Sequence, residues 1–155
     1  MNSPAPQSAL AIAQAVRHGS VSALAVAERT LDAIARVDPA LNSFTAVTAE
    51  RALAEARAID GKRLAGEALP PLAGVPYAVK NLFDVAGLPT LAGAHVHREH
   101  PPAATDAVLV ARMRDAGAVL VGTLNMDEFA YGFTTENAHF GVTRNPHDVT
   151  RVAGG

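Results

Sequence analysis

The 155-residue sequence predicts an α/β fold in which N-terminal helices precede the first strands of a sheet. The first third of the chain is rich in alanine and divided by capping residues, a pattern typical of helices. Further along, two short apolar runs flank a helical segment, and this strand–helix–strand order implies that the two strands are parallel. We therefore expect a helical layer over residues 1–68 and the start of an α/β core over residues 69–155, within one domain.

Composition excludes several classes of protein. The chain is 49% hydrophobic and 18% charged, with 13 Lys and Arg against 15 Asp and Glu, so it has enough apolar surface for a core. A net charge of −2 argues against a nucleic-acid or anionic-membrane partner, and the lack of cysteine excludes thiolate chemistry. There is no basic head of a signal peptide and no run of about 18 apolar residues, which predicts a cytoplasmic protein without membrane contact.

Three helices are expected in the N-terminal layer. The first covers residues 7–18 and closes at Gly19. Ser20 or Ser22 can cap the second, which we expect to end near Val37 because Pro39 disfavours a helical conformation at the residue before it. The third follows Thr48 and covers residues 49–64.

The second part of the chain predicts a strand–helix–strand unit. The strands are residues 76–80 and 118–121, the second ending at Gly122, and residues 87–102 form a long loop between them. Thr105 or Asp106 caps the intervening helix, which runs to residue 116. After Gly122, Asn125 is expected to cap a short helix that Glu128 completes as a capping box.

Lys80 is the sharpest candidate for chemistry because its ammonium follows a predicted buried strand. Desolvation lowers the pKa of a lysine, and a neutral lysine can act as a general base near pH 7. The alternative is a structural lysine at a strand end, paired with a carboxylate such as Asp84.

A second candidate region follows the second strand. Parallel strands open at the same edge of a sheet, so Lys80 should converge with residues 123–134. In that segment Tyr131, Gly132, Phe133 and Thr134 offer aromatic surface, close backbone approach and a hydroxyl for substrate binding. The alternative is that the aromatic side chains are core residues.

Two other groupings carry weaker hypotheses. His95, His97 and His100 could form a strand-borne metal site, but three histidines in a polar loop are more often solvated, so no metal is expected. Asp127 and Glu128 could be paired carboxylates. Adjacent residues on a helix do not face each other, which favours capping roles.

Two long motifs, GVPYAVKNLFDVAGLPTLAGA and GTLNMDEFAYGFTTENAHFGVTRNPHD followed by RVAGG, resemble the N-terminal part of amidase-signature hydrolases. The resemblance begins near Ser8. It implies a large mixed sheet flanked by helices, no cofactor, and amide hydrolysis by a Ser-cisSer-Lys triad through an acyl-enzyme. In that scheme Lys80 accepts a proton from a bridging serine.

The two triad serines of the family belong to a Gly-Gly-Ser-Ser-Gly-Gly stretch and a later Gly-Ser pair. Here the first stretch begins at Gly154-Gly155, so we expect the chain as given to be inactive. The serines that are present lie in or beside the predicted N-terminal helices: Ser3, Ser8, Ser20, Ser22 and Ser43.

Within the family, the segment NMDEFAYGFTTEN favours a small urea-like amide. Tyr131 and Phe133 occupy positions where glutaminase subunits of tRNA amidotransferases carry Met and Ser, and the larger aromatic wall would narrow the pocket. The resemblance implies a substrate such as 1-carboxybiuret, from cyanuric acid breakdown, with a small accessory subunit, and it allows a homo-oligomer. The alternatives are the glutaminase and, for a naturally complete chain, a non-catalytic interaction module.

Overall fold

The computed structural model describes residues 8–155 of the chain. The helices and strands in this part, in chain order, are α1 (Ala9–Arg17), α2 (Ala23–Leu41), β1 (Phe44–Val47), α3 (Ala49–Leu64), β2 (Pro76–Lys80), the 3₁₀ turn η1 (His95–His97), α4 (Val108–Asp115), β3 (Val119–Leu124), the 3₁₀ turn η2 (Glu128–Ala130), β4 (Glu136–Asn137) and β5 (Gly141–Val142). Among these residues, no helix combines the length and apolarity needed to cross a membrane.

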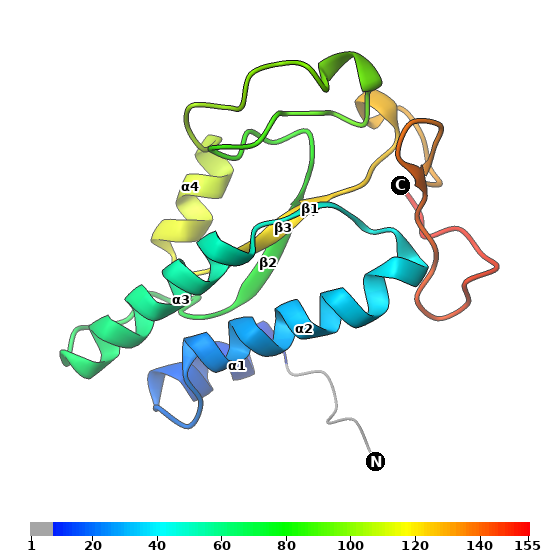
Figure 1. Ribbon diagram of the computed structural model, residues 1–155. Coiled ribbons are helices and arrows are strands. Elements are labelled where there is room, and N and C mark those ends of the chain that lie inside the picture. The colour runs from blue at the N-terminus through cyan, green and yellow to red at the C-terminus, as the bar shows by residue number, and fades with distance from the viewer. Residues whose placement is uncertain (1–7) are drawn as a thin grey trace.

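The sheet at the centre of the structure is mixed and has the strand order β1-β3-β2 (Figure 1). β2 runs parallel to β3, with Pro76 opposite Val119 and Lys80 opposite Leu124, which confirms the predicted parallel pairing. β1 runs antiparallel to β3 on its other side. β3 is therefore the central strand, and the predicted α/β class is confirmed.

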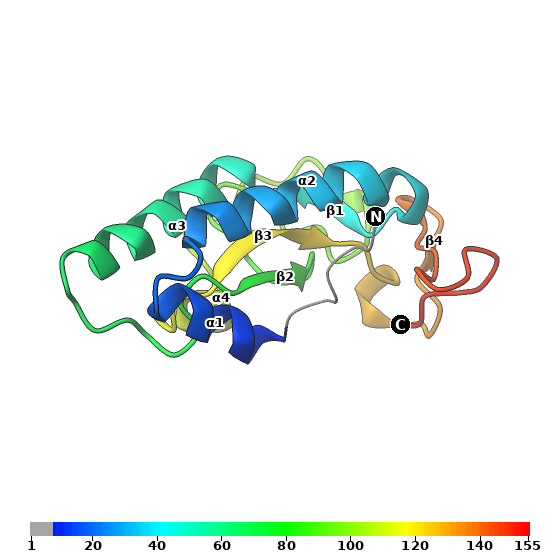
Figure 2. The same cartoon turned by 90° about the horizontal axis from the view of Figure 1, so that it is seen from below.

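β3 packs against helices on both faces of the sheet. Val119 and Val121 belong to an apolar cluster with α2 and α3, which lie along one side of the sheet (Figure 2). Leu120 points the other way, into a second cluster with Val110 of α4 and Val85. Burial on both faces explains why the strand is a continuous apolar run.

The first two helices begin at serine caps. The Ser8 hydroxyl accepts a hydrogen bond from Ala11 N at 3.2 Å, and the Ser22 hydroxyl accepts one from Ala25 N at 3.0 Å. Ser22, not Ser20, is thus the cap of α2. The predicted start of the first helix at Gln7 lies outside the described residues.

α2 extends beyond the predicted end near Val37. It continues through Pro39 to Leu41 and stops at Asn42, which has a left-handed conformation with φ 55°. Pro39 removes one backbone donor, but it lies in the last turn, where Asp38 accepts hydrogen bonds from Ser43 N at 2.7 Å and Phe44 N at 3.2 Å. These side-chain bonds fix the helix end that the proline was expected to set.

Two further predictions were wrong around the sheet. The layer over residues 1–68 contains a strand, β1, and β3 does not stop at Gly122 but runs on to Leu124. Gly122 is needed inside the strand, because a Cβ there would lie 2.4 Å from Ala46 O. The glycine permits the close approach of β1 rather than ending β3.

The caps predicted for the second half were also wrong. α4 begins at Val108 with Ala107 as its N-cap, while Asp106 instead binds Arg51 of α3. The short helix η2 has Asp127 as its N-cap. The Asn125 amide donates to Gly141 O at 3.0 Å, so this residue ties down a later loop.

Candidate functional site

Lys80 is the last residue of β2 and lies beside Leu124, the last residue of β3. Its carbonyl accepts a hydrogen bond from Phe83 N at 3.1 Å, which turns the chain out of the sheet. The side chain is half-buried, and within residues 8–155 it forms no ion pair. The suggested alternative partner, Asp84, accepts instead from the Thr90 hydroxyl.

The segment after β3 presents its aromatic side chains to solvent. Tyr131 is 94% exposed and Phe133 is 89% exposed, so in this structure they are surface residues and not part of the core. Gly132 packs closely on Asp127, because a Cβ at residue 132 would lie 2.4 Å from the Asp127 carboxyl carbon. The predicted substrate-binding residues thus stand on a tightly held backbone.

Backbone strain is concentrated in the same segment. Phe129, Ala130 and Thr135 have positive φ angles of 52°, 60° and 54°. The carboxylate of Asp127 accepts a hydrogen bond from Thr135 N at 3.1 Å and so bridges the ends of the strained stretch. Left-handed residues other than glycine are costly and gather at ligand-binding sites, which marks this segment as a functional candidate.

The last two glycines lie against this segment. The Thr135 hydroxyl donates to Gly154 O at 2.7 Å, and a Cβ on Gly155 would lie 2.6 Å from Phe133 Cα. The structure therefore brings residues 132–135 together with Gly154 and Gly155. Lys80 lies beside Leu124 in the sheet, and the chain continues from Leu124 through Asp127 to the strained segment.

Three buried asparagines hold the loops beyond the sheet, and we did not single them out as site residues from the sequence. Asn81, Asn125 and Asn137 are 2%, 6% and 5% exposed. Asn81 and Asn125 each follow a strand directly, and this position in the sequence is the signal by which their role could have been predicted. The amide of Asn137 donates to Gly93 O at 2.7 Å and to Met126 O at 2.8 Å, which joins two loops.

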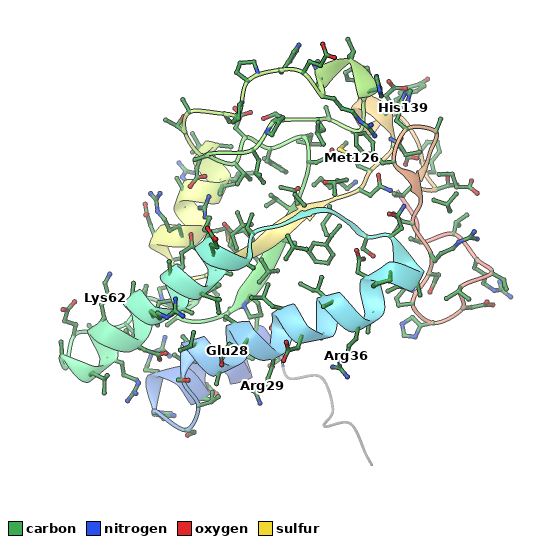
Figure 3. The ribbon with its side chains drawn as sticks, in the orientation of Figure 1. Glu28, Arg29, Arg36, Lys62, Met126 and His139 are labelled. Atoms are coloured by element: carbon green, nitrogen blue, oxygen red, sulfur yellow. The ribbon has the colours of Figure 1, made fainter. Side chains whose placement is uncertain are left out.

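The three histidines of the predicted metal site lie in the loop between β2 and α4. His95 and His97 belong to the 3₁₀ turn η1 rather than to a strand, and His97 Nδ1 lies 3.2 Å from His100 Nδ1. His139 Nε2 lies 3.4 Å from Glu128 Oε1. Within the described part of the chain, no group of three or more His, Cys, Asp or Glu residues is arranged to hold a metal ion. Figure 3 shows His139 and Met126 beyond the end of β3, far from Lys62 on α3.

A cluster of charged side chains lies near β2, between α3 and the segment that precedes α4. Arg51 of α3 donates to both carboxylate oxygens of Asp106 at 2.7 and 2.8 Å. This hydrogen bonding raises the pKa of Arg51 and lowers the pKa of Asp106 below its usual range. Burial raises the pKa of Tyr77 to about 12. These pKa shifts come from burial and from the ion pair that joins α3 to the segment before α4, and they do not mark a reactive group.

The amino-terminal ends of β2 and β3 carry a hollow of about 400 Å³. Glu55, Lys62, Arg114 and Gly117 are among its lining residues. Lys80 and residues 131–134 do not line it, because they lie at the opposite end of the strands. The candidate residues predicted from the sequence thus lie at the carboxyl edge of the sheet, the edge where open α/β sheets commonly bind ligands.

Comparison with known proteins shows which family the chain belongs to. A family model described as Amidase matches residues 25–155. The AtzE subunit of 1-carboxybiuret hydrolase from Pseudomonas sp. (strain ADP) is 60% identical over 144 residues. These residues are 93% of this chain and 32% of that protein. A glutamyl-tRNA(Gln) amidotransferase subunit of Acidothermus cellulolyticus is 47% identical over 149 residues, which are 96% of this chain and 29% of that protein.

Solved structures match over nearly the whole chain. A vestigial protein complex that reveals the evolutionary origins of an s-triazine catabolic enzyme contains a chain with a TM-score of 0.95 and 58% identity, matched over 96% of this chain and 33% of that one. A bacterial aryl acylamidase has a TM-score of 0.90 and 33% identity, matched over 96% of this chain and 31% of that one. The chain thus spans about a third of the length of the proteins it matches.

Proposed function

Because the chain belongs to the amidase family, we propose that it supplies the catalytic lysine, Lys80, of an amide hydrolase. The observation that carries the proposal is the place of Lys80 at the carboxyl edge of the sheet, beside Leu124 and without an ion-pair partner in the described residues. A general base must be able to reach and contact the group whose proton it takes, and an ion pair would hold the lysine nitrogen elsewhere.

In the proposed mechanism, neutral Lys80 accepts a proton from a bridging serine, which takes one from a nucleophilic serine. The nucleophile attacks the amide carbonyl, and the tetrahedral intermediate breaks its C–N bond as the amine receives the proton back from Lys80 through the bridging serine. The acyl-enzyme that remains is then hydrolysed by water. In the family, one triad serine belongs to the Gly-Gly-Ser-Ser-Gly-Gly stretch whose first glycine pair corresponds to Gly154-Gly155. The contacts of that pair with Phe133 and Thr135 support a shared site for the serine and the strained segment.

For the substrate, we propose a small urea-like amide of the 1-carboxybiuret type. The 60% identity to AtzE of 1-carboxybiuret hydrolase supports this choice over other amides. Tyr131 and Phe133 are exposed beside the strained backbone, and aromatic rings of this kind can stack on a flat substrate. The match to a chain of a complex related to an s-triazine catabolic enzyme supports a place in cyanuric acid breakdown with a small accessory subunit, and we propose a cytoplasmic location.

A glutaminase that serves a tRNA amidotransferase is the second candidate. It is favoured by the 47% identity to the amidotransferase protein of Acidothermus. The two candidates differ in the amide that they cleave, so one assay with both substrates separates them.

The test is the change Lys80→Ala in the full-length gene product, with ammonia release measured from 1-carboxybiuret and from glutamine. Loss of the general base should lower kcat by about 10²- to 10⁴-fold. The chain has only one other lysine, Lys62, so Lys62→Ala is the matched control and should keep full activity. We further propose that residues 1–155 alone are inactive on both substrates. Activity of Lys80→Ala within a few-fold of the unmodified enzyme would remove Lys80 from the mechanism.

A further inference from the structure

We propose that Asn81 is a positioning residue that holds the backbone from which Lys80 projects. This inference rests on the proposed role of Lys80 as the base. Asn81 follows Lys80 directly and is only 2% exposed, although it is a polar residue at the edge of the sheet. A buried asparagine must have partners for its amide, and those partners define what it holds.

Both backbone groups and both amide atoms of Asn81 are hydrogen-bonded. Its N–H donates to Leu124 O at 3.0 Å, and its carbonyl accepts from Ala92 N at 3.0 Å. Its side-chain oxygen accepts from Gly93 N at 2.9 Å, and its side-chain nitrogen donates to Thr45 Oγ1 at 3.3 Å. One residue therefore ties the end of β2 to β3, to β1 and to the loop before η1.

Lys80 needs such support because its own side chain has none. In residues 8–155 its ammonium forms no ion pair, and no hydrogen bond from it to another side chain or to a carbonyl is present. A long side chain without partners is positioned only by its root and by the walls around it. An error of about 1 Å in the position of a catalytic group can cost about 10²-fold in rate.

The hydrogen bonds of Asn81 continue, through Gly93 and Asn137, to the chain that precedes Tyr131 and Phe133. Gly93, held by Asn81, gives its carbonyl to the Asn137 amide at 2.7 Å, and that amide also donates to Met126 O at 2.8 Å. There is no spare room at this junction, because a Cβ on Gly93 would lie 3.0 Å from both Met126 O and Asp127 O. Asn81 therefore sets the position of the base relative to the proposed substrate segment.

The experiment compares Asn81→Ala and Asn125→Ala in the full-length gene product, using 1-carboxybiuret or, for a glutaminase, glutamine. Asn125 is the matched control, because it is also a buried asparagine after a strand, but its amide nitrogen holds Gly141 and Thr143 and its amide oxygen accepts from its own neighbour, Met126 N, at 2.9 Å. We expect Asn81→Ala to lower kcat by about 10- to 100-fold with KM within three-fold of the unmodified enzyme. Asn125→Ala should lower kcat by less than three-fold.

A milder variant covers the case in which Asn81→Ala does not fold. Thr45→Val removes the acceptor of the Asn81 amide together with the hydrogen bonds of Thr45 to Thr123, and we expect it to lower kcat by about three- to ten-fold at unchanged KM. The inference is wrong if Thr45→Val keeps full kcat, or if Asn81→Ala keeps kcat within two-fold while Lys80→Ala is inactive. It is also wrong if Asn125→Ala loses as much kcat as Asn81→Ala. An active Lys80→Ala would instead overturn the proposed function.

Discussion

Asp106 shows how one residue can serve a purpose that its neighbours in the sequence do not reveal. Its carboxylate is nearly buried and accepts two hydrogen bonds from Arg51 and one from Ala86 N at 3.0 Å. The guanidinium of Arg51 lowers the pKa of Asp106, so the folded protein favours the charged form. The carboxylate therefore stabilises the fold above the ordinary pKa of 3.8 and loses this contribution as the pH falls through its lower folded value.

We predict that Asp106→Asn lowers the free energy of unfolding at pH 7 by about 1.5–3 kcal/mol, because the charge-assisted bonds to Arg51 are lost. The gap to the unmodified protein should narrow as the pH falls from 3.8 towards about 2.5, because the unfolded chain then binds a proton at this carboxylate that it must release on folding. Urea unfolding across this range measures the gap. Asp115→Asn, at an exposed ion pair with Arg114, is the control and should change stability by less than 1 kcal/mol. A gap that stays constant with pH would contradict the prediction.

At the level of single residues, the sequence revealed the candidate base but not what holds it. Lys80 could be found because a charge inside an apolar run is visible locally. Asn81 stands beside it, yet its amide partners Thr45 and Gly93 lie 36 and 12 residues away. The role of a buried amide depends on which loops the fold brings to it, and spacing in the sequence does not contain this information.

Among the elements, β1 depends on a missing side chain in β3. Gly122 lets Ala46 O and the ring of Phe44 come within 2.4 and 2.8 Å of the place that a Cβ would fill. Any larger residue must push the edge strand away from the centre of the sheet. The closeness of β1 is thus encoded far along the chain, as the contact of Thr45 with Thr123, 78 residues later, illustrates.

We predict that Gly122→Ala lowers the free energy of unfolding by about 1–3 kcal/mol through overpacking of β1 against β3. The control is Gly61→Ala in α3, where no atom lies within 4 Å of the added methyl group. That change should instead stabilise the protein by about 0.5–1 kcal/mol, because alanine is the better helix former. Thermal and urea unfolding of the two variants give the signs. Equal stability of Gly122→Ala and the unmodified protein would show that β1 adapts at no cost.

Elements with local signals were predicted well, and those set by distant partners were not. The predicted bounds of β2 and α3 agree with Pro76–Lys80 and Ala49–Leu64. The ends of α2 and β3 were misplaced because proline and glycine usually interrupt regular structure. Here the Asp38 carboxylate binds the backbone after Pro39, and the lack of a side chain at Gly122 lets β1 approach β3. β1 itself is four residues long, too short for a period to show.

For the molecule as a whole, the outer edges of the sheet determine how readily one chain associates with another. Within the described residues, β1 and β2 each pair only with β3, so each has an unpaired backbone edge. Tyr131 and Phe133 add exposed aromatic surface at the carboxyl end of the strands. Open strand edges and exposed aromatic side chains both favour association.

We predict that residues 1–155, produced alone, self-associate at concentrations on the order of 1 to 100 μM, as light scattering on a sizing column would measure. The double change of Tyr131 and Phe133 to serine separates the two causes, because it removes the aromatic surface and leaves the strand edges open. Reduced association of this variant would assign the effect to the aromatic patch, and unchanged association to the edges. A monomer at every concentration would contradict the prediction.

The central position of β3 also sets the order in which the chain can assemble. β1 and β2 are made first, but neither pairs with the other, and both wait for residues 119–124. Until then a growing chain can pack α2 on α3, whereas the sheet must close loops of tens of residues in one late step. Such a high contact order predicts slow folding and a period in which β1 and β2 are unpaired. During synthesis, the arrival of a single strand therefore joins the helical half of the molecule to the half that carries Lys80.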